Sequence, residues 1–271
     1  MTPPPVIETV ALPQAATARP LPIPRYLEQV YWWAYVHPKA VHVFEREWLV
    51  NLILFGNYGR LRDAAIASLG EPDEQAPGRP KLARAPSGGS DVAKRRSGGG
   101  FVSGRTLQVA CAYGNLTPRL REQLAPEASL DVVDILPIQL KNLASKLPPD
   151  ERVALLQGDS SSLACEDASY DQVLLFFLLH EQPEAVRRKT LAEAMRVVKP
   201  GGKVVIVDYH RPVPLHPLRL LMTGVFRRLE PYAMDLWDHE VTEFLPRGFQ
   251  PASITKRTWF GGLYQKLVIT R

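Results

Sequence analysis

Two aspartates stand where a nucleoside could be held. Asp134 ends the apolar run in LDVVDILP, and Asp159 follows the apolar run in VALLQGDSSSL. A carboxylate that ends the second strand of a doubly wound sheet can accept hydrogen bonds from both ribose hydroxyls. A carboxylate after the third strand can accept one from an adenine amino group. The structural alternatives are a helix start for Asp134, in the pattern Asp-x-x-Pro, and a turn for Asp159. We predict the ribose and adenine roles.

The stretch QVACAYGNLT, Gln108 to Thr117, has the position of a nucleotide-binding loop, because a strand-like run precedes it and a helical pattern follows. The usual S-adenosylmethionine (SAM) loop reads D-V-G-C-G-T-G-x-x-T. Here Gln108 replaces the acid, Ala110 and Ala112 replace two glycines, and only Gly114 remains. Glutamine donates and accepts hydrogen bonds but carries no charge. We therefore expect SAM to bind with its aminoacyl end held differently.

A mostly parallel sheet is needed to bring these residues together. Strands are predicted at 105–111, 130–134, 152–157, 170–177 and 202–208, and helices near 116–125, 137–147, 183–198 and 215–230. Two late strands, near 251–259 and 263–270, flank Gly261-Gly262, which is typical of a hairpin. The prediction is an α/β fold with a Rossmann-like sheet of the class I methyltransferase type. Its C-terminal hairpin is antiparallel, and helices precede it.

The chain divides into four predicted parts. Residues 1–24 are proline-rich and predict a disordered tail. Residues 25–70 predict a helical substrate cap and 71–104, with PSGGS and KRRSGGG, a low-complexity insertion. Residues 105–271 form the predicted SAM-binding Rossmann-like domain. In the cap, one helix from Tyr26 ends before Pro38 and another ends at Gly70. Between them a single helix is predicted to bury Val41, Phe44, Trp48, Leu52 and Phe55.

Composition limits the environment and the partners. The chain has 271 residues, a formal net charge of +5 and two cysteines, which suits a reducing compartment. No apolar run reaches the roughly 20 residues of a membrane-spanning helix, and no secretory signal is visible. No nucleic-acid-binding motif is present. We expect a cytoplasmic protein without a nucleic-acid partner, and its oligomeric state stays open.

Six segments of the chain closely resemble the rhodoquinone biosynthesis proteins, the RquA family. They are YWWAYVHP, REWLVNLILFGNY, LQVACAYGNLT, LDVVDILPIQL, LLFFLLHEQP and VDYHRPVPLHPLR. The resemblance covers about Tyr26 to Pro246, apart from the insertion. It implies an enzyme that converts ubiquinone to rhodoquinone by replacing a ring methoxy group with an amino group. It also implies SAM as the nitrogen donor, with manganese(II) assisting. A loop without its acid would leave the amino group of SAM free to attack.

The implied manganese directs attention to residues that follow the fourth and fifth strands. Manganese prefers oxygen and imidazole ligands and could polarise a quinone carbonyl as a Lewis acid. His180 and Glu181 follow one strand, and Asp208 and His210 end the other. These four residues are the predicted metal ligands. The alternative is that His180 only gates the pocket and His210 caps a turn.

The predicted site combines these groups. The predicted catalytic residues are His180, Glu181 and Tyr58, and the predicted SAM-binding residues are Gln108, Ala110, Gly114, Asp134, Ile135, Asp159 and Ser160.

Ubiquinone is a lipid, so the implied enzyme must reach a membrane. The segment HPLRLLMTGVFRRLE predicts a helix with arginines flanking one apolar face, which contains Leu218, Leu221, Met222, Val225, Phe226 and Leu229. Such a helix can lie in a lipid surface or line a quinone tunnel. The alternative is packing on the protein's own sheet. We expect peripheral association with the inner membrane.

Two other functions remain open. An ordinary SAM-dependent quinone or phenol methyltransferase would need a base near the acceptor, which His180 could supply. The second function is that of a catalytically inactive scaffold that binds SAM or a quinone. The altered loop, Gln108 to Thr117, favours this function.

Overall fold

The computed structural model describes residues 21–71 and 100–271. Most of the predicted tail and of the predicted insertion therefore lies outside the described residues. Seven strands form one sheet: β1 Arg105–Val109, β2 Ser129–Asp134, β3 Val153–Gln157, β4 Tyr170–Phe176, β5 Val198–Tyr209, β6 Ser253–Trp259 and β7 Tyr264–Thr270. Their order is β3-β2-β1-β4-β5-β7-β6.

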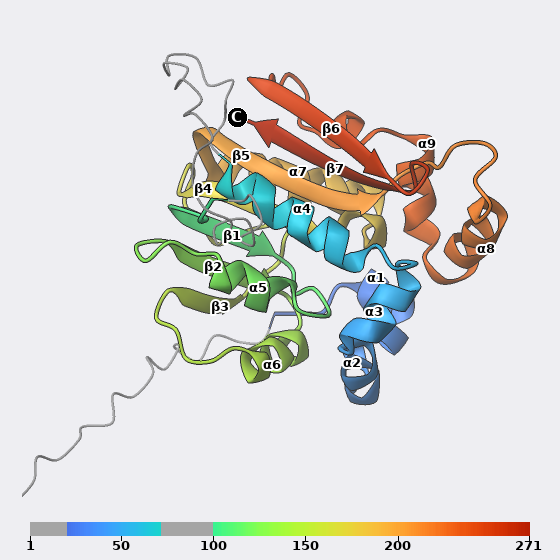
Figure 1. The fold of residues 1–271 in the computed structure, drawn as a ribbon, viewed down its shortest axis with the longest axis horizontal. Coiled ribbons are helices and arrows are strands. Elements are labelled where there is room, and N and C mark those ends of the chain that lie inside the picture. The colour runs from blue at the N-terminus through green and yellow to red at the C-terminus, as the bar shows by residue number, and fades with distance from the viewer. Residues whose placement is uncertain (1–20, 72–99) are drawn as a thin grey trace, which may run out of the picture.

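Only β7 runs against its neighbours. It pairs antiparallel with β5 and β6, whereas the pairs among β1 to β5 are parallel. The central strands are buried on both faces, as in a parallel sheet covered by helices. This arrangement confirms the predicted class I methyltransferase-type sheet with its antiparallel hairpin (Figure 1). The chain order reverses between β1 and β4, so the carboxyl ends of these strands flank the crevice in which such folds bind ligands.

Helices cover both faces of the sheet. They are α1 Arg25–Gln29, α2 Pro38–Phe44, α3 Glu47–Ile53, α4 Tyr58–Gly70, α5 Leu116–Glu122, α6 Pro137–Lys146, α7 Glu184–Val197, α8 Arg219–Leu229 and α9 Asp235–Asp238. Helix α4 crosses the front of the sheet in Figure 1, and α7 lies behind it. Leu61 and Leu174 belong to the front core, and Leu191 and Val173 to the rear core. These two cores hold the strand ends in fixed positions.

The N-terminal helices differ from the prediction. The first predicted helix is broken: α1 ends at Gln29 and a π-helical turn spans Trp32–Val36. The break turns Tyr31 inward, where its ring lies 6.5 Å from that of Tyr232. The predicted single second helix is also wrong, because α2 and α3 are separate. The break between them shifts the helical phase, so Trp48 and Leu52 of the expected apolar stripe are exposed.

The amphipathic segment begins its helix later than predicted, at Arg219, because Pro214 and Pro217 keep the preceding turn irregular. Its predicted apolar face packs largely on the protein itself. Met222 and Phe226 are buried in the front core. For these side chains the alternative of self-packing is therefore correct. No helix among the described residues has both the length and the apolar content to span a bilayer.

Candidate cofactor and catalytic site

A cavity of about 420 Å³ opens at the carboxyl ends of β1, β2 and β4. One side is formed by the loop after β1 and by residues following β2 and β3. The other side is formed by the N-terminal helices and the end of α8. The cavity therefore joins a nucleoside-type half to an aromatic and apolar half. Its charged lining residues are Asp134, Asp159, His180, Glu181 and Glu230, without lysine or arginine among the described residues.

Asp134 lies at the floor of the nucleoside half. Its Oδ2 accepts a hydrogen bond from the Cys111 amide (2.7 Å) and its Oδ1 accepts one from the Leu136 amide (2.8 Å). Burial raises the pKa of Asp134 to about 6, against the lowering effect of these two bonds. Each oxygen keeps a second lone pair that can accept a ribose hydroxyl. The Asp134 side chain can therefore stabilise the local turn and accept hydrogen bonds from a ribose at the same time.

Asp159 and Ser160 form the far end of the same half. Asp159 Oδ1 accepts hydrogen bonds from the Ser161 amide and hydroxyl, both at 2.8 Å, so a turn role is present. The Ser160 hydroxyl lies 3.0 Å from Thr190 Oγ1 and accepts from Gln182 Nε2. Both residues line the cavity together with Ala110 and Ile135. This half presents the two carboxylates that the sequence assigned to a nucleoside.

Gln108 does not line the cavity. Its side chain is fully buried: Nε2 donates to the Ala110 carbonyl (2.9 Å) and Oε1 accepts from the Thr117 hydroxyl (2.9 Å). Ala110 has a φ of 70°, a left-handed conformation that glycine adopts more easily. The Gln108 bond holds this strained residue in place. The predicted SAM contact of Gln108 is therefore replaced by a role in bracing the loop.

Gly114 also lies behind the cavity lining, against Tyr58. Its φ is 83°, and a Cβ there would come within 2.6 Å of the Tyr58 hydroxyl. That hydroxyl accepts from the Asn115 amide (2.8 Å) and donates to the Tyr113 carbonyl (3.2 Å). Burial raises the pKa of Tyr58 well above its usual range. Tyr58 lines the cavity, and its hydroxyl is used to position the loop.

The N-terminal helices are tied to this loop by further polar contacts. Glu45, between α2 and α3, accepts hydrogen bonds from the Gly114 amide (3.2 Å) and the Asn142 side chain (2.5 Å), and it pairs with Lys146. The Tyr113 hydroxyl donates to the Ala34 carbonyl at 2.6 Å. Glu45 therefore supplies a carboxylate to the loop after β1 from outside the loop sequence, and it does not line the cavity.

His180 and Asp208 form a buried pair beside the aromatic and apolar half of the cavity. His180 Nδ1 lies 2.8 Å from Asp208 Oδ1, and Asp208 also accepts from the Leu179 and Tyr209 amides (2.9 and 2.7 Å). The ring of Tyr209 meets the imidazole edge to face, with centroids 4.8 Å apart. These contacts fix the imidazole so that Nε2 faces the cavity, the arrangement of an oriented acid or base.

Two further carboxylates approach Nε2 of His180. Glu181 Oε1 lies 3.7 Å away and Glu230 Oε2 lies 3.8 Å away. Burial alone would lower the pKa of His180, but Asp208, Glu230 and Glu181 outweigh it and raise the pKa to about 9. Burial raises the pKa of Glu230, although His180 opposes this. At neutral pH His180 is therefore mainly a cation and a hydrogen-bond donor.

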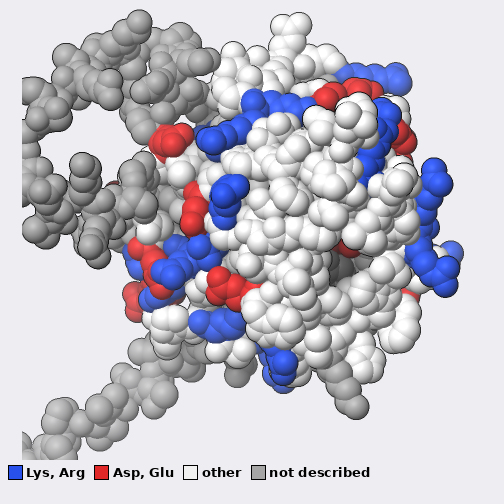
Figure 2. Space-filling model, turned by 45° about the vertical axis from the view of Figure 1, so that its right-hand side comes forward, with Lys and Arg blue, Asp and Glu red and all other residues white. Residues whose placement is uncertain are grey.

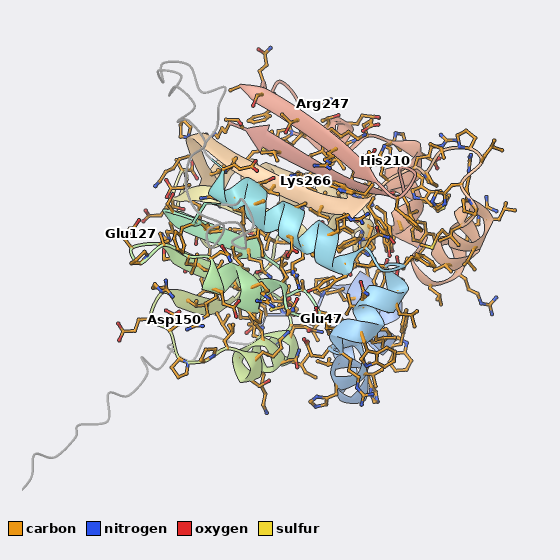
Figure 3. The ribbon with its side chains drawn as sticks, in the orientation of Figure 1. Glu47, Glu127, Asp150, His210, Arg247 and Lys266 are labelled. Atoms are coloured by element: carbon orange, nitrogen blue, oxygen red, sulfur yellow. The ribbon has the colours of Figure 1, made fainter. Side chains whose placement is uncertain are left out.

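The four predicted metal ligands do not assemble. His210 lines a separate surface cavity beside the β6–β7 hairpin (Figure 3). Its Nδ1 lies 2.7 Å from the Gly262 carbonyl and its Nε2 lies 2.9 Å from Lys256. The oxygens of Asp208 already contact His180 and backbone amides. Within residues 21–71 and 100–271, no group of three or more His, Cys, Asp or Glu side chains could hold a metal ion. The predicted manganese does not fit these residues.

Sequence reasoning missed Glu230, although a signal was present. Glu230 directly follows α8, and a carboxylate is unfavourable beside the carbonyl end of a helix dipole. An acid in such a place suggests a requirement other than helix stability. Glu45 gave no comparable signal, because its partners lie 69 or more residues away along the chain.

Comparisons with known proteins agree with this geometry. Residues 106–202 match a family model described as a methyltransferase domain. A demethylmenaquinone methyltransferase from Staphylococcus aureus is 32% identical over 108 residues, 40% of this chain and 44% of the relative. The chain thus spans less than half the length of the curated relatives it matches. Human N-acetylserotonin methyltransferase in complex with SAM has the same fold, with a TM-score of 0.55 and 14% identity over 91% of this chain and 62% of that chain.

The segment that matches the methyltransferase family begins in β1 and ends in β5. It includes the loop after β1, both nucleoside-half aspartates and His180, while the N-terminal helices, Asp208 and Glu230 lie outside it. The chain therefore has a class I methyltransferase-type fold, and its residues 106–202 are similar to a methyltransferase domain.

Proposed function

We propose that the chain is a SAM-dependent transferase that acts on an apolar quinone-type ring. It transfers the methyl group of SAM to a quinol or a phenol. One observation carries the proposal. A single cavity holds two carboxylates suited to the nucleoside of SAM and an oriented His180–Asp208 pair within an aromatic lining. The Staphylococcus aureus relative, named for demethylmenaquinone, supports a ring substrate of this class.

In methyl transfer, His180 accepts the proton of the acceptor hydroxyl while the methyl group leaves sulfur. A cationic His180 cannot do this. The positive sulfonium of SAM lowers the pKa of a neighbouring imidazole, since a like charge disfavours the protonated form. Cofactor binding would therefore prepare His180 as a base. Asp208 keeps the imidazole in the required orientation and stabilises the imidazolium that forms.

A second candidate is replacement of a ubiquinone methoxy group by the amino nitrogen of SAM, as the resemblance to the RquA family implies. The raised pKa of His180 favours it, because a cationic imidazole can donate a hydrogen bond to a quinone carbonyl. This polarises the ring without a metal ion. The amine then adds to the carbon that carries the methoxy group, and methanol leaves, so the nitrogen joins the ring while still bound to Cα of SAM. Transfer of the two electrons and the proton of the Cα–H bond to the quinone gives an imine and a quinol. Water then cleaves the imine and releases the amino-substituted quinol and a 2-oxo acid. Gln108, neutral and buried, adds no charge that would hold the amine protonated.

The test uses SAM labelled with heavy carbon in its methyl group and heavy nitrogen in its amino group. The full chain is incubated with ubiquinone and with ubiquinol analogues lacking one ring methyl, and products are identified by mass spectrometry. Heavy carbon in the ring product, with S-adenosylhomocysteine, supports methyl transfer. Heavy nitrogen in the quinone, with free methanol, supports amination. SAM binding without any labelled product, in a folded protein, contradicts both and leaves a binding scaffold.

The substitution His180→Gln serves as the matched control. It keeps a polar side chain of similar size beside Asp208 but removes the titratable imidazole. We expect SAM affinity to change little and turnover to fall by about 10²–10⁴-fold, as for loss of a general acid or base.

A further inference from the structure

The outer side of α8 and the turn before it are apolar and exposed. Leu215 and Leu220 expose 95% and 87% of their surface, and Leu221 exposes 54%. These residues are distinct from the buried Met222 and Phe226 on the inner side. Covering such large apolar side chains removes them from water and is favourable, so a group of them on one surface indicates a contact site.

The same row of side chains leads from this surface into the main cavity. Leu221, Val225 and Leu229 are spaced four residues apart, so they follow one line along α8. Leu221 is exposed, Val225 lines the cavity, and Leu229 does both. On the opposite side, Ile53 of α3 also lines the cavity and is exposed, and Leu52 beside it is exposed. The cavity mouth therefore lies between α3 and α8. We call Leu52, Ile53, Leu220, Leu221 and Leu229 the apolar rim.

Positive charge accompanies the apolar rim. From Arg211 to Leu229 the sequence contains four arginines and no acidic residue. Arg227 and Arg228 are exposed on the last turn of α8. Figure 2 shows a hollow with an acidic residue inside it, surrounded by uncharged surface, with basic side chains along the right margin of the view. Apolar side chains flanked by arginines match the interface of an anionic bilayer, which offers acyl chains below phosphate groups.

We propose that the apolar rim and Arg227 and Arg228 dock the protein on an anionic lipid surface, with the cavity mouth facing the bilayer. A protein partner seated on the rim would close the mouth, whereas a bilayer leaves it open to solutes dissolved in the lipid. The placement of the mouth rests on the proposed function, because it takes the main cavity as the site of an apolar substrate. Docking itself does not require turnover.

The experiment is vesicle co-sedimentation of the full chain without SAM or quinone. Vesicles are either pure phosphatidylcholine or an equimolar mixture of phosphatidylcholine and phosphatidylglycerol. We expect binding to the mixed vesicles, weaker binding to the neutral ones, and weakening by salt. Leu220→Asp with Leu221→Asp should lower binding at least tenfold. Arg227→Gln with Arg228→Gln should lower binding to the anionic vesicles by about tenfold or more, since each basic residue near such a surface adds about fivefold to binding.

Matched controls lie on other parts of the surface. Ile254→Asp removes an exposed apolar side chain of β6, and Arg247→Gln removes an exposed arginine on the β6 side of the molecule (Figure 3). Both should bind vesicles as the parent does, and circular dichroism should show all variants folded.

Absence of binding by the parent, or equal loss of binding in rim and control variants, overturns the proposal. The proposal is also overturned if the parent does not bind vesicles but forms a concentration-dependent dimer in ultracentrifugation, and Leu220→Asp with Leu221→Asp abolishes that dimer. Labelled-product formation on a short-tailed, water-soluble quinone tests the proposed function separately.

Discussion

The Tyr58 hydroxyl occupies the space that a side chain at position 114 would need, and Gly114 leaves that space open. The contact joins α4, from the N-terminal helices, to the loop after β1. Through it the loop geometry depends on a residue outside the segment that matches the methyltransferase family.

Gly114→Ala should therefore destabilise the protein by more than backbone strain alone. A positive φ costs an alanine about 1–2 kcal/mol, and the clash with Tyr58 adds about 1–3 kcal/mol. SAM affinity, measured by calorimetry, should fall as well. Gly56→Ala is the matched control, because Gly56 has a φ of 76° but no atom within 4 Å of the position that a Cβ would take. Adding Tyr58→Phe should recover part of the loss at position 114 and none at position 56. Equal effects at the two glycines would contradict the packing argument.

Gln108→Glu should destabilise the loop. A carboxylate cannot donate to the Ala110 carbonyl, and the buried carbonyl is left facing a negative charge, at a cost of about 1–3 kcal/mol or more. Burial raises the pKa of an introduced carboxyl, and its protonated form can donate, so the loss should be smaller at pH 5 than at pH 8. Denaturant unfolding at both pH values measures this. Gln157→Glu breaks a similar bond to the Ile135 carbonyl at an exposed position, and should change little.

The pH dependence of turnover should distinguish the two candidate reactions. If His180 acts as a base, the rate rises as pH increases through the pKa of His180 in the SAM complex; if it acts as a cationic donor, the rate falls over the same range. In the absence of ligand this pKa is about 9, above the usual value of 6.5. The folded state therefore holds the proton more tightly. The resulting stabilisation is complete below about pH 6.5 and is lost as pH rises through about 9. His180→Gln should flatten this part of the stability profile.

Glu230→Gln should lower the pKa of His180, because it removes one of the three carboxylates that raise it. NMR titration of the imidazole would measure the shift, and the pH–rate profile should move to lower pH by the same amount. A purely structural role for Glu230 would change stability without moving the profile. Glu122→Gln, an exposed acid on α5, is the control and should leave the imidazole pKa unchanged.

Much of the Rossmann-like core could be predicted from the sequence, because its strands are short apolar runs separated by helical patterns. The positions of Asp134 and Asp159 at the cavity follow from the same regularity, since both end or follow parallel strands. The same reasoning places His180 and Asp208 at one edge of the sheet. Their direct pairing was not predicted, because it depends on the short turn Leu179–Glu181 after β4.

The N-terminal helices could not be predicted as well. Apolar periodicity continues across Glu45, so the sequence favours one helix, but Glu45 turns away to contact the loop and α6. A long-range polar contact thus outweighs local periodicity. His210 illustrates the opposite case: its position two residues after Asp208 indicates the same edge, yet the hairpin carbonyl of Gly262 holds it outside the cavity.

Helix α8 carries exposed Leu220 and Leu221 on its outer side, and the residue that follows it, Glu230, has its Oε2 3.8 Å from His180 Nε2. A contact that displaces this helix changes the distance between the Glu230 carboxylate and the His180 imidazole. The pKa of His180 changes with that distance. By thermodynamic reciprocity, protonation of His180 must then alter how strongly α8 holds whatever contacts its outer side. A contact on the outer side of α8 and the protonation of His180 are thereby coupled through one helix. The strength of surface binding should then depend on pH, and surface binding should shift the pKa of His180.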